Sequence, residues 1–222
     1  GRCGLGAMAA KKQQRLQRPE IPRKTVYRLS IYNRCLQRLA ANGIRTVSSE
    51  ALARAAGVKS TQLRKDLTYF GQFGTRGLGY EVEQLLQLIM DLLGTASLQP
   101  VVLVGAGNLG RALLSYRGFQ KEGFEVVAAF DVAAKEKKAK NPAQPVYPME
   151  RLVPIIKKQN VRMAVICVPP EEAQKVANEL VKAGIVGIMN FAPTVLQVPE
   201  DVMVNNVNLA IELENLSYFI QQ

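Results

Sequence analysis

Residues 101–119 read VVLVGAGNLGRALLSYRGF and decide the fold of the second half of the chain. Four apolar residues typical of a buried strand run into a glycine-rich turn, and an apolar pattern with helical spacing follows. A strand, a G-x-G-x-x-G turn and a helix together form the phosphate-binding unit of dinucleotide-binding folds. In such a unit Gly105 makes the tight turn, Gly107 lets the pyrophosphate approach the backbone, and Gly110 allows close packing of helix on strand.

An acidic residue stands where such a fold holds the adenosine ribose. Asp131 follows Gly110 by 21 residues and ends the next apolar strand, expected at 125–131. Its carboxylate can accept hydrogen bonds from the ribose hydroxyls and repels a 2′-phosphate, which favours NADH and NAD⁺ over their phosphorylated forms. The unpaired backbone N–H groups at the start of the helix, where Asn108 and Leu109 stand, would face the phosphates, and Ala106 belongs to the same cofactor site.

Strands and helices alternate after residue 100. Strands are expected at 101–104, 125–131, 161–168, 186–191 and within 202–208, and helices at 109–121, 149–159, 170–183 and 209–220. Continuous apolar strands between helices indicate a parallel sheet covered on both faces. The final helix carries Leu209, Leu213, Leu216 and Phe219–Ile220 on one face.

The positive charge of the chain is confined to its first third. Residues 1–80 hold 16 of the 29 Lys and Arg but only 3 of the 18 Asp and Glu, a net charge of +13, whereas residues 81–222 carry −2. A cationic unit joined to a nearly neutral one indicates a polyanionic partner for the first unit. The alternative is an ordinary solvated basic surface.

The same region has the pattern of a winged helix-turn-helix. Helices are expected at 22–41, with Val26 and Leu29 among the inward residues, at 49–57 with Ser49 as N-cap and Leu52 and Ala55–Ala56 inward, and at 60–70. The glycine-rich segment 71–80 is expected to form a β-hairpin, and 81–93 a further helix. This arrangement places the helix at 60–70 in the major groove of DNA, with the hairpin as its wing.

Basic and polar side chains around that helix are the candidates for DNA contact. The candidates are Arg23, Lys24, Arg28, Lys59, Ser60, Thr61, Gln62, Arg64, Lys65 and Arg76. Gln62 and Arg64 are expected to read bases, while Lys59 and Lys65 meet phosphates, Arg76 enters a minor groove, and Leu63 and Leu67 belong to the core.

The features of a dehydrogenase active site are missing from the sequence. The chain has no histidine, and no tyrosine is followed by a lysine four residues later. Positioned acids or bases are what hydride-transfer enzymes require, so we expect no enzymatic activity. Cys167 ends an apolar strand near the expected nicotinamide end, where it is either a redox or contact residue or a small buried residue, and its apolar neighbours favour the second.

Composition sets further limits. Three cysteines without a C-x-x-C pair argue against a disulfide framework or a zinc site and fit a reducing cytoplasm. No apolar run is long enough to cross a membrane, and no signal peptide is expected. The expected organisation is a flexible arm at 1–19 whose start resembles a cloning remnant, a winged-helix domain at 20–94, a Rossmann domain at 95–207 and a C-terminal helix at 208–222.

Both units in this order resemble the Rex family of redox-sensing transcriptional repressors. The matching stretches are IPRKTVYRLSIYNR, STQLRKDLTYFGQFGTRGLGY, VVLVGAGNLGRALLSYRGF, VICVPPEEAQ, IMNFAP and NNVNLAIELENLSYF, which together span about residue 20 to the end. The resemblance implies a homodimer that exchanges its C-terminal helices, binds operator DNA when NADH is scarce and releases it when NADH accumulates.

By position, the resemblance also assigns residues to the nicotinamide pocket. Tyr116 matches a tyrosine beside the nicotinamide, and Val168, Pro169 and 190–193, including Asn190 and Phe191, match the surrounding loops. These pocket residues are mostly apolar, which disfavours the cationic ring of NAD⁺ by desolvation and favours NADH.

The match has one departure that bears on the switch. Many members carry an aspartate where this chain has Asn208, and that acid pairs with the tyrosine of the partner subunit. Asn208 can still form a hydrogen bond with Tyr116 but has no charge, so the strength of the contact is in question here.

Two alternative functions follow from the same residues. One is a small NAD-dependent oxidoreductase with a basic arm. The other is a regulator whose Rossmann domain binds another nucleotide, such as CoA or FAD.

Overall fold

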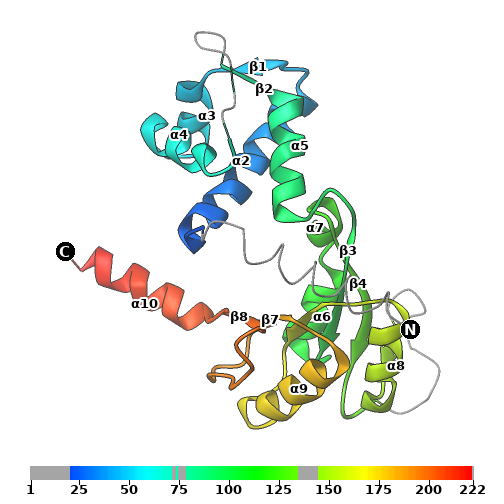
Figure 1. Ribbon diagram of the computed structural model, residues 1–222. Coiled ribbons are helices and arrows are strands. Elements are labelled where there is room, and N and C mark those ends of the chain that lie inside the picture. The colour runs from blue at the N-terminus through cyan, green and yellow to red at the C-terminus, as the bar shows by residue number, and fades with distance from the viewer. Residues whose placement is uncertain (1–20, 72–73, 75–78, 135–144, 222) are drawn as a thin grey trace. The chain divides into compact units, whose positions relative to one another are not determined.

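The structure is a computed structural model that describes residues 21–71, 74, 79–134 and 145–221 (Figure 1). It divides into two compact units, Gly1–Ala96 and Ser97–Gln222. The arm expected at 1–19, Arg76 and most of the hairpin expected at 71–80 lie outside the described residues.

Four helices and a two-stranded sheet form the described part of the first unit. These are α2 (Arg23–Ala41), α3 (Ser49–Ala55), α4 (Ser60–Thr68), α5 (Val82–Leu93), β1 (Thr46–Val47) and β2 (Tyr80–Glu81). The two strands pair antiparallel, so the chain returns after α4 to lie beside the segment that precedes α3. The order of α2, α3, α4 and β2 agrees with the expected winged helix-turn-helix.

The core of this unit is formed by the apolar faces of all four helices. Leu29 and Leu36 of α2 are buried with Leu52 of α3 and with Leu63 and Leu67 of α4, which confirms the inward positions expected for α4. The helix α5 adds Val82, Leu85 and Ile89 and ends at Gly94, whose φ of 73° suits a glycine.

Three local expectations for this unit are wrong. The N-cap of α3 is Ser48, whose side chain accepts a hydrogen bond from the Ala51 N–H at 3.1 Å, and Ser49 is already helical. In α3 the buried partner of Leu52 is Ala53, since Ala55 is exposed and Ala56 only partly buried. Val26 is 41% exposed because α2 turns the neighbouring Thr25 inward instead.

The second unit is built on a six-stranded parallel sheet in the order β5-β4-β3-β6-β7-β8. The strands are β3 (Gln99–Val104), β4 (Phe124–Phe130), β5 (Val146–Tyr147), β6 (Met163–Ile166), β7 (Gly187–Asn190) and β8 (Met203–Asn206). The chain starts in the middle, builds outward to β5 and then crosses back to β6. The carboxyl ends of β3 and β6 therefore meet at the point where the strand order reverses, which is the usual ligand position in such sheets.

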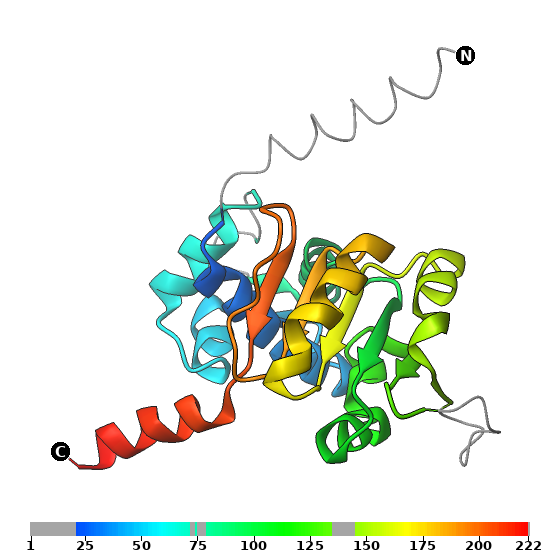
Figure 2. The ribbon, with the colours of Figure 1, turned by 90° about the horizontal axis from the view of Figure 1, so that it is seen from below.

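Helices cover both faces of this sheet, as the sequence indicates (Figure 2). The helices are α6 (Asn108–Ser115), α7 (Gly118–Lys121), α8 (Leu152–Lys158) after a 3₁₀ turn at Met149–Arg151, and α9 (Pro170–Ala183). Val102, Val104 and Phe130 are buried on the face covered by α8 and α9. Val101 and Leu103 point to the other face, where α6 packs.

Two elements of the second unit differ from expectation. The helix expected at 109–121 is two helices, because Tyr116 has an extended ψ of 105° that ends α6. The short strand β5 lies in a segment expected to be a loop, where two residues are too few to show a periodic pattern.

The last helix, α10 (Leu209–Ile220), buries none of its residues within this chain. Leu213, Leu216 and Phe219 are 68%, 59% and 70% exposed. A helix with its apolar face this exposed needs another surface to cover it. Among the helices that the structure describes, none is long and apolar enough to span a membrane.

Candidate functional site

The turn after β3 has the close approaches that the glycine pattern predicts. Gly105 has a φ of 102°, and a Cβ there would lie 2.6 Å from the carbonyl carbon and oxygen of Cys167 at the end of β6. A Cβ on Gly110 would collide with the carbonyl oxygen of Gly105. A Cβ on Gly107 would meet no atom within 4 Å, so the space beside Gly107 is open to a ligand.

Asp131 lies beside this turn although it is 25 residues away from it in sequence. Its Oδ2 accepts a hydrogen bond from the Ala106 N–H at 2.7 Å, and its Oδ1 accepts one from the Ala133 N–H at 2.8 Å. The carboxylate is therefore held by backbone donors next to the glycine-rich turn. That is the position which a ribose-binding acid requires.

The helix α6 begins at the end of this turn. Gly107 is its N-cap residue, and Arg111 N–H donates to the Gly107 carbonyl at 2.9 Å. The side chains of Asn108 and Leu109 are exposed, and the first N–H groups of a helix have no partner within it. The helix start therefore offers backbone donors to an anion, whereas the Ala106 N–H of the turn is already bound to Asp131.

Tyr116 stands exposed at the end of α6. Its ring is 59% exposed and meets Phe119 edge-on, with ring centres 5.1 Å apart at 86°. The Tyr116 ring also lies directly against Gly118, where a Cβ would collide with ring atoms. Tyr116 thus contacts Phe119 and Gly118 within the chain, while much of its surface remains exposed to solvent.

The end of β6 adjoins the glycine-rich turn. A Cγ1 atom of Val168 would lie 3.0 Å from a Cβ on Gly105, and Pro169 is the N-cap residue of α9. Cys167 is partly buried, and burial raises the pKa of its thiol to about 11. The thiol therefore stays protonated at neutral pH, which supports the expectation of a packing residue over a redox residue.

Asn190 occupies a structural position in the described chain. It is buried, and its Nδ2 donates to the Ala192 and Thr194 carbonyls at 3.1 and 3.0 Å and to Asn206 Oδ1 at 2.9 Å. Its Oδ1 accepts from the Ala192 N–H at 3.0 Å. The amide of Asn190 thus ties the loop after β7 to β8. Phe191 packs nearby, in the same apolar cluster as Cys167.

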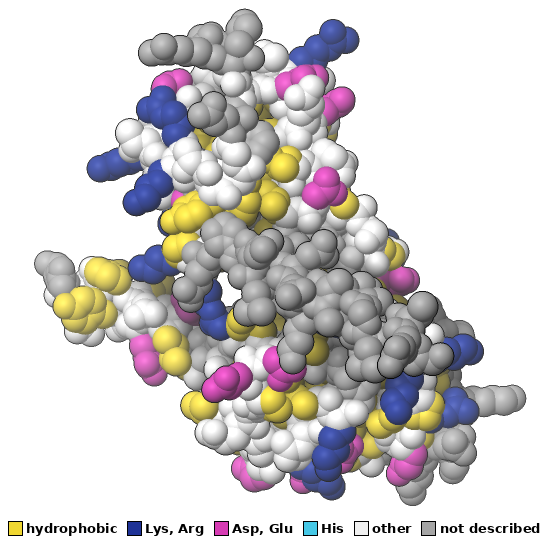
Figure 3. Space-filling view, in the orientation of Figure 1, with side chains coloured by type: hydrophobic (Ala, Val, Ile, Leu, Met, Phe, Trp, Pro, Cys, Tyr) yellow, Lys and Arg dark blue, Asp and Glu magenta, His cyan; other side chains and the backbone are white. Residues whose placement is uncertain are grey.

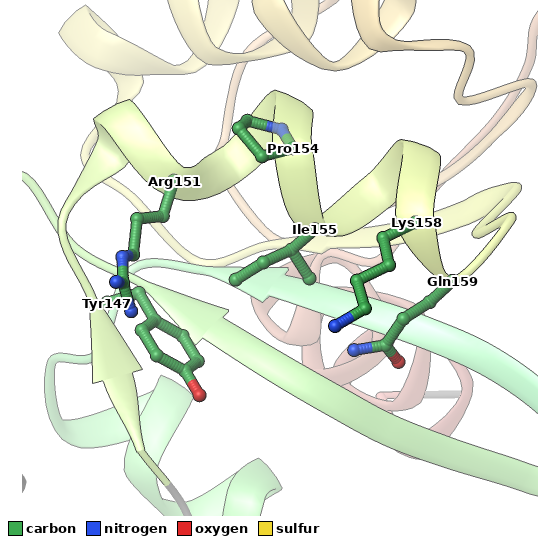
Figure 4. A pocket seen from close by; sticks show the side chains of 6 residues that line it. All are labelled: Tyr147, Arg151, Pro154, Ile155, Lys158 and Gln159. Atoms are coloured by element: carbon green, nitrogen blue, oxygen red, sulfur yellow. The ribbon is translucent and has the colours of Figure 1, made fainter.

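Two cavities on this unit were not expected from the sequence. One has a volume of about 390 Å³ and lies beside the segment that follows Asp131 in sequence. It is lined by Val132, Ala134, Met149, Glu150, Glu172, Lys175, Val176 and Glu179. The other, of about 370 Å³, lies between β5 and α8 and is lined by Tyr147, Arg151, Pro154, Ile155, Lys158 and Gln159 (Figure 4). The first includes Val132, the residue after Asp131, whereas the second lies at the edge of the sheet beside β5.

Apart from Ser60, which is partly buried, the described residues expected to contact DNA separate into two groups. Lys59, Thr61, Arg64 and Lys65 are exposed, and Arg23 and Lys24 are exposed at the start of α2. Lys and Arg side chains of the first unit gather over α3 and α4 (Figure 3). Arg64 also lies 3.4 Å from Ser60 Oγ and 3.7 Å from Glu50, both exposed contacts that leave it near the surface.

Arg28 and Gln62 form the second group, because both bind Asp66 instead of facing outward. Arg28 Nε and Nη2 donate to the two Asp66 oxygens at 2.6 and 2.7 Å. Gln62 Nε2 donates to Asp66 Oδ1 at 2.9 Å. Sequence reasoning missed Asp66, although an acid between Leu63 and Leu67 in a basic helix was a visible signal.

Known proteins match this chain over both units. Residues 20–68 match a family model described as "Putative DNA-binding protein N-terminus", and residues 97–194 match "CoA binding domain". The redox-sensing transcriptional repressor Rex of Carboxydothermus hydrogenoformans is 47% identical over 91% of this chain and 98% of its own length. The chain belongs to the Rex family. The Rex of Streptomyces coelicolor is 48% identical over 91% of this chain and 78% of its own length.

Solved Rex-family structures share the fold of this chain. RSP, a Rex-family repressor, was solved in complex with β-NAD⁺ and operator DNA, with a TM-score of 0.84 and 35% identity over 91% of this chain and 93% of that one. RSP in complex with β-NADH has a TM-score of 0.79 and 34% identity over 91% and 95%. The family is therefore confirmed, as is a fold class with an N-terminal DNA-binding domain followed by a Rossmann-like parallel sheet.

Proposed function

We propose that this Rex-family chain is a homodimeric repressor that binds operator DNA and is released from it by NADH. The observation that carries the proposal is the coexistence of two sites in one chain. One is a phosphate-binding turn closed by Asp131, and the other is a helix-turn-helix with exposed cations on α4. The proposed domains are residues 20–94 for DNA and 95–207 for the coenzyme.

The coenzyme would lie across the carboxyl ends of β3 and β6. The pyrophosphate would sit at Gly107 and the start of α6, and the ribose at Asp131, with the adenine in the cavity beside Val132. The nicotinamide would then reach Tyr116 and the segments after β6 and β7, where Val168 and Phe191 are apolar. An apolar pocket penalises the cationic ring of NAD⁺ more than the neutral ring of NADH.

Two of these proposed roles depend on a second subunit. The exposed apolar face of α10 supports an exchange of this helix between the two copies of a dimer. Tyr116, also exposed, would meet Asn208 of the partner subunit. NADH would act by favouring one arrangement of the dimer, because a ligand shifts an equilibrium only by its differential affinity for the two states. A nearly complete switch takes about 5.5 kcal/mol of such difference.

Redox sensing predicts unequal responses to the two coenzyme forms. A duplex enriched from a randomised library with the coenzyme-free chain serves as the operator probe. We expect NADH to weaken binding to this duplex at concentrations where NAD⁺ has little effect, at fixed salt. Fluorescence anisotropy of the labelled duplex measures both titrations. Equal responses to NADH and NAD⁺ would contradict the proposal.

The two alternative functions, an oxidoreductase and a CoA-binding regulator, would each give a different experimental result. We propose that the chain is not an enzyme, since Cys167 is held as a neutral thiol and the sequence lacks histidine. Steady turnover of an alcohol or hydroxy acid with NAD⁺ would support the oxidoreductase alternative. The match of residues 97–194 to a CoA-binding family model keeps CoA as a second candidate ligand. A titration with CoA that releases the operator probe would favour it.

Replacing Asp131 with asparagine tests the proposed ribose contact. We expect NADH affinity to fall by about 10-fold to 100-fold, the effect of about 1.5–3 kcal/mol for a hydrogen bond to a charged group. The ratio of NADH to NADPH affinity should fall as well, because the repulsion of the 2′-phosphate is lost. NADH fluorescence measures both constants. Glu125→Gln, exposed on β4, the strand that Asp131 follows, is the matched control and should leave both unchanged.

A further inference from the structure

A buried carboxylate links the recognition helix α4 to α2. Asp66 is fully buried on α4, and its oxygens receive hydrogen bonds from side chains of both helices. In addition to Arg28 and Gln62, the Tyr32 hydroxyl donates to Oδ2 at 2.8 Å and the Thr25 hydroxyl lies 3.4 Å from Oδ1. Thr25, Arg28 and Tyr32 of α2 thus meet Asp66, from which they are 34 to 41 positions away in sequence. We call these residues, with Gln62, the Asp66 cluster.

The cluster keeps Asp66 ionised despite its burial. Burial by itself would raise the pKa of Asp66, but the hydrogen bonds from Arg28, Tyr32 and Gln62 outweigh it and leave the pKa below its ordinary value. The same carboxylate raises the pKa of Arg28 through their hydrogen bonds. Both groups therefore stay charged and form an ion pair, with the Arg28 side chain 21% exposed and that of Asp66 1% exposed.

The position of Asp66 on α4 determines which side chains of this helix face outward. Asp66 lies on the inner side with Leu63 and Leu67, and Gln62, one turn before Asp66, is partly buried. Thr61, Arg64, Lys65 and Thr68 lie on the outer side. The two leucines also hold α4 in the core, but apolar contacts have no direction, whereas a bidentate arginine fixes an angle.

We propose that the Asp66 cluster fixes the rotation of α4 about its axis, and that Arg28 and Gln62 affect DNA binding through this orientation rather than by touching DNA. This inference rests on the proposed function. Arg28 and Gln62 then have a positioning role, although an arginine and a glutamine at these places would be expected from sequence alone to contact DNA. A buried ion pair adds little net stability, but in some proteins such a pair fixes how one element is oriented against another.

The proposal predicts different effects on DNA binding for two substitutions that change the charge equally, one of an arginine and one of a lysine. Arg28→Met and Lys65→Met each remove one positive charge from the same unit. A residue that contacts a phosphate contributes about 0.9 to the slope of log affinity against log salt, and its loss weakens all duplexes alike. A residue that orients α4 instead affects the base contacts, so its loss lowers the ratio of operator to random-duplex affinity.

The experiment uses the full chain and a duplex enriched from a randomised library with the unchanged protein. For Lys65→Met we expect a lower salt slope and an unchanged ratio. For Arg28→Met we expect an unchanged salt slope and a ratio that falls about tenfold or more, the size of one mismatched base pair. A lower slope with an unchanged ratio for Arg28→Met would overturn the proposal, because Arg28 would then act as a phosphate contact.

A second variant covers the case in which Arg28→Met does not fold. Arg28→Lys keeps the charge but loses the two-pronged contact with Asp66. We expect an intermediate fall in the ratio and an unchanged slope, and an unchanged ratio would contradict the proposal. NADH binding by the second unit checks that each variant is folded there, and circular dichroism checks the helices of the first. If no duplex is enriched by the unchanged protein, the proposed function itself fails, which separates the two outcomes.

Discussion

Replacing Gly107 with alanine should abolish most NADH binding while leaving the fold intact. A Cβ at this position meets no protein atom within 4 Å, and the backbone φ of −69° suits any residue. The added methyl group would occupy the space through which the pyrophosphate reaches the backbone donors. We expect NADH affinity to fall by about 100-fold or more, or about 2.7 kcal/mol, as hydrogen bonds to a charged group are lost.

Thermal unfolding and NADH fluorescence together measure this effect. The midpoint of unfolding without NADH should match that of the unchanged chain. Gly110→Ala provides the contrast, because its Cβ would collide with the Gly105 carbonyl oxygen and should lower both stability and binding. On the operator probe, Gly107→Ala should remain bound at NADH concentrations that release the unchanged chain. Undiminished NADH binding by Gly107→Ala would place the coenzyme elsewhere.

Charges on the apolar face of α10 should dissociate the dimer. Leu213 and Leu216 are 68% and 59% exposed in the single chain, so their replacement by glutamate costs no contact within it. In the proposed dimer both would be buried, and an unpaired buried carboxylate is strongly disfavoured. We therefore expect the double variant Leu213→Glu/Leu216→Glu to be folded and monomeric.

Loss of the dimer should have a large effect on operator binding. Two linked recognition units exceed the affinity of either one by about 10²–10⁴-fold. Light scattering measures the mass of the variant, and anisotropy measures its affinity for the operator probe. Glu214→Gln, on the opposite side of α10, is the matched control and should leave both unchanged. A dimeric Leu213→Glu/Leu216→Glu variant would show that α10 is not the interface.

Features determined by neighbouring residues could be predicted from the sequence. The glycines at 105, 107 and 110 have the surroundings that the pattern requires, and Asp131 lies at the turn as expected. The sheet and its two-sided cover followed from the apolar strands, because each strand carries its own signal. The inner leucines of α4 followed from helical spacing.

Features that depend on distant residues could not be predicted in this way. The contact between Arg28 and Asp66 joins positions 38 apart, and nothing in the local pattern of α2 distinguishes Arg28 from a DNA-binding arginine. The choice of Ser48 over Ser49 as N-cap depends on backbone angles that two adjacent serines do not reveal. The end of α6 at Tyr116 could not be predicted either, because no proline stands there to mark the end of a helix.

The junction between β8 and α10 has a consequence for the conditions under which the protein works. Asn208 caps α10, and its Oδ1 accepts from the Ala210 and Ile211 N–H groups at 3.0 and 3.4 Å. A carboxamide neither gains nor loses a proton in the biological range, and the chain has no imidazole elsewhere. The cap of α10 at Asn208 therefore does not depend on protonation within the biological pH range.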